Sequence, residues 1–200
     1  MFEIRGGPGI FPTMPAVARP LPRFLTATLA RELGILLTLS VLFPFLMHLL
    51  PVPETSRLGA RLLPMFYAPL LAALWGRRET GWLVAALAPW LNWALTGHPA
   101  PVGAVVMMIQ LLVFVLVVPL LLNTAMVRWL VAVPAYLAGM GMAMLAAFVI
   151  PALIGGRAPV TWLAQSVVMS LPGVALLVLI TCAVLRFYPP SGQGGGPMAA

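Results

Sequence analysis

The sequence of 200 residues contains no aspartate and no lysine, and Cys182 is its only cysteine. Without lysine it has no Gly-x-x-x-x-Gly-Lys loop, so it does not bind ATP in that way. Without aspartate it cannot hold a metal through clustered aspartates, as some membrane phosphotransferases do. One cysteine excludes an internal disulfide and a metal site built from several cysteines. These absences argue against catalysis, and we expect no enzyme, no cofactor and no resident metal.

Charged residues of any kind are scarce. They make up 8% of the chain, whereas 62% is hydrophobic and the mean hydropathy is +1.06. A soluble domain carries about 25% charged residues, so a water-soluble globule is excluded. All positive charges are arginines, and we assign the net charge of +7 to loops that flank membrane spans rather than to a nucleic-acid surface. The composition predicts a multi-pass protein of the cell (bacterial inner) membrane.

Long apolar runs between turns rich in proline and glycine predict six transmembrane helices. The first run begins at Leu33, or earlier with an amphipathic lead-in from Phe24. Pro51 and Pro53 end it, because proline cannot continue the helical ladder. The second run is short and contains Pro64 and Pro69, so we expect it to be kinked or partly re-entrant. The predicted spans are 33–50, 62–75, 82–95, 102–122, 129–150 and 160–185. The predicted fold class is therefore an all-α integral membrane protein with six helices.

The arginines predict the orientation of these spans. With the N-terminus inside, eight arginines fall in cytoplasmic segments and three outside, as the positive-inside bias requires. The inner set is Arg5, Arg19, Arg23, Arg31, Arg77, Arg78, Arg128 and Arg186; the outer set is Arg57, Arg61 and Arg157. Both termini are then cytoplasmic. We divide the chain into a cytoplasmic N-terminal segment (1–32), a six-helix membrane domain (33–188) and a flexible C-terminal tail (189–200).

The acidic residues bear on how transport could be energised. No glutamate lies inside a predicted span, and only Glu32 lies at the edge of the first one. Ion-coupled transporters normally need an ionisable group within the membrane. Secondary ion-coupled transport is therefore disfavoured.

Small residues recur at helical spacing in two predicted spans. They are Ala135, Gly139, Ala143 and Ala147 in the fifth span, and Ala68 and Ala72 in the second. Such stripes allow two membrane helices to approach closely. Two interpretations remain open: packing inside the chain, or a docking face for a partner subunit.

Polar and aromatic residues gather near the predicted outer face. The candidates for substrate binding are Glu54, Tyr67, Asn92, Trp93, Thr96, His98 and, within the fourth span, Gln110. Asn92 and Thr96 share one helical face because they are four residues apart. Singly, each residue has an ordinary explanation as an interfacial or helix-packing residue. Together they suit a small-molecule pocket with apolar walls and a few hydrogen-bonding groups.

Between Leu62 and Leu122 the chain carries the segments Leu63-Pro-Met-Phe-Tyr-Ala-Pro-Leu-Leu-Ala-Ala-Leu-Trp-Gly76 and Pro89-Trp-Leu-Asn-Trp-Ala-Leu-Thr-Gly-His-Pro99. With them this part of the sequence resembles the substrate-capture (S) components of energy-coupling factor transporters. Pro64, Met65, Leu70, Leu71 and Ala72 match that family's Pro-Met-His-hydrophobic-Pro segment and the Leu-Leu-Ala-Gly that follows it. Its Pro-Leu-Leu-x-x-Leu-Leu-Thr-Gly-Met-Pro segment is matched by Pro89, Leu91, Leu95, Thr96, Gly97 and Pro99. The chain also departs from the family pattern. Phe66 replaces the usual histidine and Pro69 falls one residue late. Ala73 stands where glycine is usual, His98 replaces methionine, and Gln110 falls about where many members carry glutamate.

The resemblance implies uptake of a vitamin-like or other small molecule from outside. The implied partners are a membrane scaffold (T) subunit and two cytoplasmic ATPases, whose energy would drive toppling and release inside. The chain starts Met1-Phe2-Glu3 rather than Met-His, which argues against nickel or cobalt. The main alternative is a non-transporting six-span scaffold of the cell envelope, favoured by the small-residue stripe and by the departures at Phe66 and Gln110. A membrane enzyme is a third reading.

Overall fold

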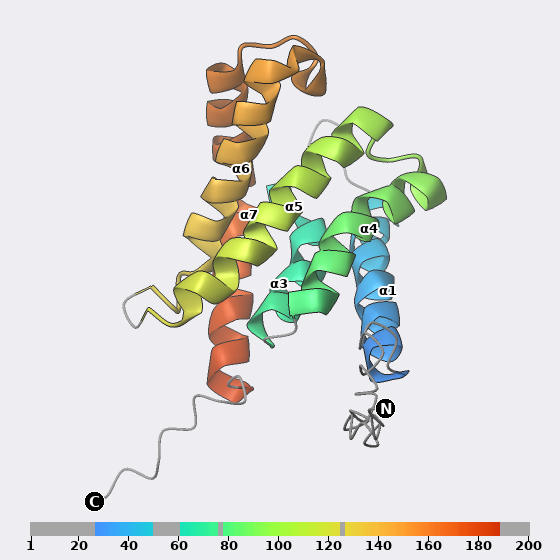
Figure 1. The fold of residues 1–200 in the computed structure, drawn as a ribbon, viewed down its shortest axis with the longest axis vertical. Helices are drawn as coiled ribbons and strands as arrows, with labels where there is room; N and C mark the ends of the chain where they lie inside the picture. The colour runs from blue at the N-terminus through green and yellow to red at the C-terminus, as the bar shows by residue number, and fades with distance from the viewer. Residues whose placement is uncertain (1–26, 50–60, 76–77, 125–126, 189–200) are drawn as a thin grey trace, which may run out of the picture.

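The computed structural model describes residues 27–49, 61–75, 78–124 and 127–188, and within these ranges all regular secondary structure is helical (Figure 1). The elements are α1 (Ala27–Leu49), the 3₁₀ turn η3 (Pro64–Phe66), α3 (Tyr67–Leu74), α4 (Arg78–Thr96), α5 (Pro101–Leu122), α6 (Ala132–Val149), the 3₁₀ turn η4 (Pro151–Ile154) and α7 (Pro159–Phe187). The all-α prediction is therefore confirmed for the described residues.

Four helical segments are long and apolar enough to span a membrane. They are Ala27–Leu46, Pro101–Leu122, Ala132–Val149 and Pro151–Phe187. Between 11% and 39% of each span is buried inside the molecule, so most of its apolar surface faces outward. Outward apolar surface on this scale is favourable against lipid and unfavourable against water. The chain is a multi-pass membrane protein.

Each of the six predicted segments coincides with a helical segment, but two of these are shorter or more polar. The apolar helix Pro64–Leu74 rises only about 16 Å, about half the hydrocarbon thickness of a bilayer. Helix α4 has 19 residues and begins with Arg78 and Glu79. Helix α1 begins at Ala27 rather than at Leu33, within the amphipathic lead-in from Phe24 that the sequence left open.

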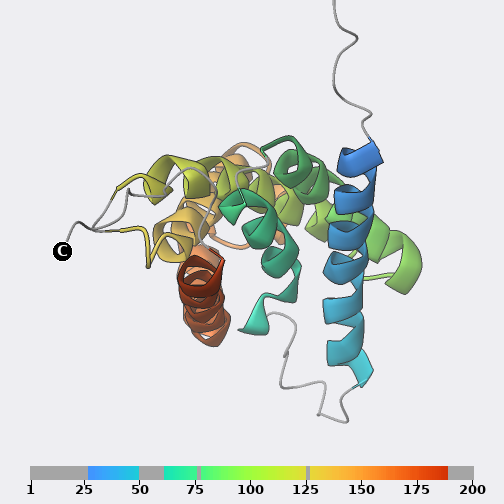
Figure 2. The same ribbon diagram turned by 90° about the horizontal axis from the view of Figure 1, so that it is seen from below.

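Helix α5 lies at the centre of the fold and crosses it diagonally (Figures 1 and 2). It contacts α3 and α4 on one side and α6 on the other, while α1 flanks α3 and α4 and α7 packs on α6 and α3. At the heart of the core, the ring of Phe66 meets those of Phe114 and Tyr136 edge to face, with centroids 5.3 and 5.5 Å apart. This aromatic contact joins η3, α5 and α6.

The small-residue stripes are buried inside this fold. On α6, Ala135, Gly139 and Ala143 are covered, and a Cβ atom on Gly139 would lie 2.6 Å from the backbone oxygen of Gln110. Ala68 and Ala72 belong to a buried cluster with residues of α1 and α4. The chain's own helices occupy the faces on which these five residues lie. Packing within the chain is the interpretation that fits.

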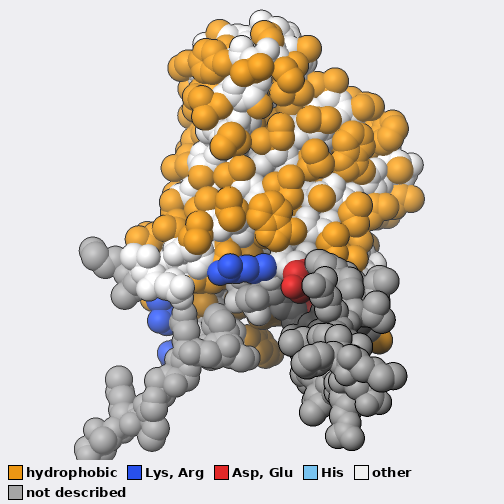
Figure 3. Space-filling view, in the orientation of Figure 1, with side chains coloured by type: hydrophobic (Ala, Val, Ile, Leu, Met, Phe, Trp, Pro, Cys, Tyr) orange, Lys and Arg blue, Asp and Glu red, His pale blue; other side chains and the backbone are white. Residues whose placement is uncertain are grey.

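Charged side chains concentrate at one end of the molecule. This is the end where α1 and α4 begin and where α5 and α7 finish (Figure 1), and it carries Arg31, Arg78, Arg128 and Arg186. On the face seen in Figure 3, hydrophobic side chains cover the upper part, and blue and red side chains appear only along the lower border. The molecule thus has a charged end and an apolar body.

Candidate functional site

A cavity of about 960 Å³ lies towards the end of the molecule away from this charged end. Its walls come from the second half of α1, from η3, from the end of α4, from the first half of α5, from α6 and from the first half of α7. Small-molecule sites usually occupy about 300–1,000 Å³. The cavity is therefore large enough for a ligand of several fused or linked rings.

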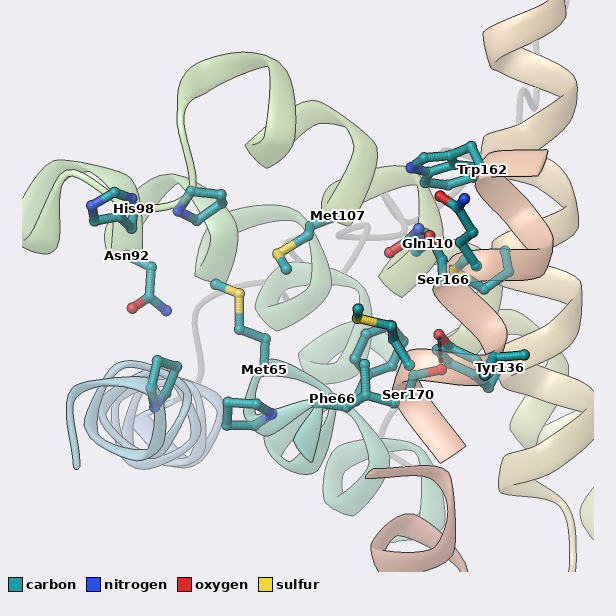
Figure 4. A pocket seen from close by; sticks show the side chains of 18 of the residues that line it. Met65, Phe66, Asn92, His98, Met107, Gln110, Tyr136, Trp162, Ser166 and Ser170 are labelled. Atoms are coloured by element: carbon teal, nitrogen blue, oxygen red, sulfur yellow. Dashed lines mark hydrogen bonds between the residues drawn. The ribbon is translucent and has the colours of Figure 1, made fainter. Parts of the chain in front are cut away.

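The middle of the cavity is apolar and rich in sulfur. Met65 and Phe66 enter it from η3 and Met107 enters it from α5, between two more polar sides (Figure 4). The chain reaches η3 through Leu63, whose φ of 53° is a left-handed conformation that costs a leucine energy. That turn brings Leu63, Pro64, Met65 and Phe66 together as one wall. Flexible thioethers beside aromatic rings form a polarisable surface that adapts to flat ligands.

Helix α7 supplies one polar side of the cavity. Trp162, Ser166 and Ser170 follow one another at intervals of four residues and line the same wall, together with Gln165 (Figure 4). Ser170 is already paired: the Tyr136 hydroxyl donates to its Oγ at 2.7 Å, and that Oγ donates to the Val167 carbonyl at 3.0 Å. The other polar groups of this wall remain suited to a ligand.

Gln110 reaches the cavity from α5 and is the most enclosed polar side chain there whose amide is not already used. It is 7% exposed, and its Nε2 donates only to the Met140 sulfur, at 3.1 Å. A thioether is a weak acceptor. The side-chain oxygen of Gln110, Oε1, has no hydrogen-bond partner among the described residues. An amide held in this state is available to a ligand.

Asn92 borders the opposite side, but its amide serves the fold. Pro44 has no N–H, so within α1 the carbonyl of Ser40, four residues earlier, loses its helical donor. The Asn92 Nδ2 donates to this carbonyl at 2.9 Å. Asn92 is 1% exposed, and its Oδ1 is buried without a partner among the described residues. The Asn92 amide therefore joins α4 to α1. This geometry favours a structural role for Asn92 over the substrate-binding role expected from the sequence.

Thr96 and His98 also line the cavity, at the end of α4. The Thr96 hydroxyl lies 2.7 Å from the Asn92 carbonyl and 3.0 Å from the His98 carbonyl, and it accepts from the His98 N–H at 3.2 Å. Gly97 turns the chain with a φ of 75°, a conformation that glycine adopts without strain. Thr96 thus fixes the turn that presents the exposed imidazole of His98.

The remaining sequence candidates lie elsewhere. Tyr67 donates its hydroxyl to the Leu62 carbonyl and packs edge to face on Phe43, outside the cavity lining. Trp93 is 39% exposed and meets Trp90 edge to face, also outside the lining. Glu54 lies outside the described residues. Of the seven candidates, the structure brings Asn92, Thr96, His98 and Gln110 to one cavity.

Sequence reasoning missed the contribution of Tyr136, Arg157, Trp162, Ser166 and Ser170. The four-residue spacing on α7 was the available signal for three of them. Among the described lining residues Arg157 is the only one with a formal charge, and none is a carboxylate or a cysteine. In the described part of the chain, no group of three His, Cys, Asp or Glu side chains is placed to hold a metal ion. The arrangement offers hydrogen bonds and ring contacts, which are means of binding.

Comparison of the chain with models of protein families, with curated proteins and with solved structures finds no match.

Proposed function

We propose that this chain is the substrate-capture subunit of an energy-coupling factor transporter, which takes up a vitamin-like or other small molecule through the cell membrane. The observation that carries the proposal is the cavity of about 960 Å³, with its apolar middle and its two hydrogen-bonding sides. It supports the proposal because such a chamber suits the capture of an organic molecule. The resemblance of the segment from Leu62 to Leu122 to that family supports the proposal independently.

The proposed topology has six spans with both termini in the cytoplasm. The described arginines at the charged end, Arg31, Arg78, Arg128 and Arg186, support it through the positive-inside bias. With that end inside, the cavity is nearer the outer surface, where a subunit that captures nutrients must meet its substrate. In this topology the short segment Pro64–Leu74 is buried among α1, α4 and α5, whereas α4 turns large apolar side chains such as Leu83, Leu87 and Leu95 outward.

The proposed mechanism divides capture from energy supply. This chain binds the substrate, and two cytoplasmic ATPases act through a membrane scaffold (T) subunit to drive its release inside. The lack of any lysine supports this division, because the chain has no phosphate-binding loop of its own. The same division requires partners, which is a testable property.

Native mass spectrometry of the protein, purified gently from its source membrane, tests the proposal. We expect a bound small molecule, or attached scaffold and ATPase subunits. Ser166→Trp, which places an indole ring in the cavity, should abolish the bound mass, whereas Leu179→Trp on the outward face of the same helix should retain it.

An intact but empty chain, recovered only with proteins of envelope synthesis, would contradict the capture function. That result would favour the scaffold alternative. The small-residue stripe no longer argues for a scaffold, since α6 uses it to pack on α5.

A further inference from the structure

The Gln110 amide is the best guide to the chemistry of the ligand. Its Nε2 carries two N–H groups, of which the Met140 sulfur takes one, and its carbonyl oxygen has two acceptor sites without a partner among the described residues. The side chain is more than nine-tenths buried and projects into the cavity (Figure 4). It therefore offers one donor and one acceptor side by side, an edge that complements a neighbouring C=O and N–H.

The walls beside Gln110 favour a flat ring system. Phe66 and Trp162 supply ring faces and edges, and Met65 and Met107 supply thioethers, which make favourable contacts with aromatic rings. Walls of this kind do not favour a heavily hydroxylated ligand such as a sugar, whose many hydroxyls would lose their water without enough partners.

Charge narrows the class further. Arg157 is the one formal charge among the described lining residues, and its Nε donates to the Ile154 carbonyl at 3.0 Å. Its two terminal nitrogens have no partner among the described residues, so they can bind an anionic group. A cation would meet this arginine and no described carboxylate.

We propose that the cavity binds an anionic ligand built on a flat aromatic heterocycle, whose uncharged ring presents a lactam edge to Gln110 and whose anionic substituent is directed to Arg157. The inference rests on the proposed capture function, whose ligand class it specifies. The lactam N–H donates to the Gln110 Oε1, and the lactam oxygen accepts from the free N–H of Nε2. Both bonds are made to a side chain that is 7% exposed, where an unmade bond is costly.

Fluorescence anisotropy with pterin-6-carboxylate, titrated with the purified full chain in detergent, tests this class. Pterin carries the lactam edge, and its carboxylate is the anion. We expect saturable binding of pterin-6-carboxylate. In 3-methylpterin-6-carboxylate the ring N–H is blocked, and this probe should bind about tenfold more weakly. Gln110→Leu should weaken pterin-6-carboxylate by about the same factor and remove the preference between the two probes. Asn123→Leu, an amide-to-leucine change at the far, exposed end of α5, is the matched control and should change neither.

The second arm of the experiment tests Arg157. Arg157→Gln should weaken pterin-6-carboxylate but not unsubstituted pterin, whereas Arg186→Gln, at the charged end, should affect neither probe. The cation N-methylquinolinium should bind more weakly than pterin to the unmodified protein. Equal binding of the methylated and unmethylated probes overturns the proposal, and the unmodified protein suffices to show it. Absence of pterin binding to the unmodified protein also overturns the proposal.

Failure of this class is distinguishable from failure of the capture function. If pterin does not bind but native mass spectrometry finds another small molecule lost in Ser166→Trp, the ligand class is wrong and capture stands. If no small molecule is found from any source, both fall.

Discussion

The contact between Asn92 and the Ser40 carbonyl yields a prediction with an internal control. The carbonyl lacks its helical donor because residue 44 is proline, and the Asn92 Nδ2 replaces that donor at 2.9 Å. Ser40 and Asn92 are both buried, at 0% and 1% exposure, so water does not compensate when the bond is removed. Asn92→Leu keeps the apolar volume and leaves the carbonyl unpaired.

Two contributions of opposite sign determine how much Asn92→Leu changes the free energy of unfolding. The Ser40 carbonyl left without a donor destabilises the protein, and the removal of the unpartnered Asn92 Oδ1 stabilises it. An orphaned buried carbonyl costs about 1–3 kcal/mol in soluble proteins, whereas interhelical hydrogen bonds in membranes average about 0.6 kcal/mol and reach about 1.7. Leucine also removes the Asn92 Oδ1, which is buried without a partner among the described residues. We therefore expect Asn92→Leu to lower the free energy of unfolding by about 1 kcal/mol.

The assay is a double-mutant cycle measured by reversible unfolding in mixed micelles. Pro44→Ala returns an N–H to residue 44, and this N–H can donate to the Ser40 carbonyl inside α1. In that background Asn92→Leu should cost close to nothing, giving a coupling energy of about 1 kcal/mol between positions 44 and 92. Equal costs in the two backgrounds would refute the argument that Asn92 satisfies a carbonyl freed by proline.

Two further predictions concern the packing at Gly139 and the position of Trp93 outside the cavity. Gly139→Ala places a Cβ 2.6 Å from the backbone carbonyl oxygen of Gln110 and should destabilise the folded protein by about 1–3 kcal/mol. A Cβ on Gly141 meets nothing within 4 Å, so Gly141→Ala should be nearly neutral in thermal unfolding. Equal effects of the two changes would contradict the close packing of α5 on α6. Trp93→Ala should leave small-molecule binding, measured by native mass spectrometry, unchanged, because its ring lies outside the cavity lining; loss of the ligand would place Trp93 in the site.

The helical segments were predictable because lipid provides no partners for backbone groups, so long apolar runs must form helices. The start of α1 was predictable only as an alternative, the lead-in from Phe24, since Arg31 and Glu32 lower the hydropathy where the helix already exists. Both residues are good helix formers, and hydropathy alone does not record that preference. For the same reason α4, with its polar first turn, was predicted four residues too short at its start, at Trp82 rather than Arg78.

The candidate site was only partly predictable. Thr96, His98 and Gln110 were found because polar residues near one end of neighbouring spans tend to meet. Ser166 and Ser170 lie among apolar neighbours on α7. Their four-residue spacing with Trp162 indicates that they share a helical face, but not whether that face turns to a cavity or to lipid. Which face of α7 turns towards η3 depends on the close approach at Gly173, where an added Cβ would lie 2.6 Å from the Arg61 carbonyl oxygen. That approach is a property of tertiary packing.

Asn92 and Gln110 show how two amides within the described membrane helices acquire different roles. From the sequence both are buried amides in apolar helices and both were candidates for ligand binding. Pro44 frees a carbonyl that needs a donor, and α4 brings Asn92 to it. For Gln110 the corresponding neighbour is the Met140 thioether, which is too weak an acceptor to satisfy an amide. A polar residue in a membrane helix therefore indicates a ligand only after the carbonyls released by nearby prolines have been assigned their donors, and after that assignment Gln110 remains.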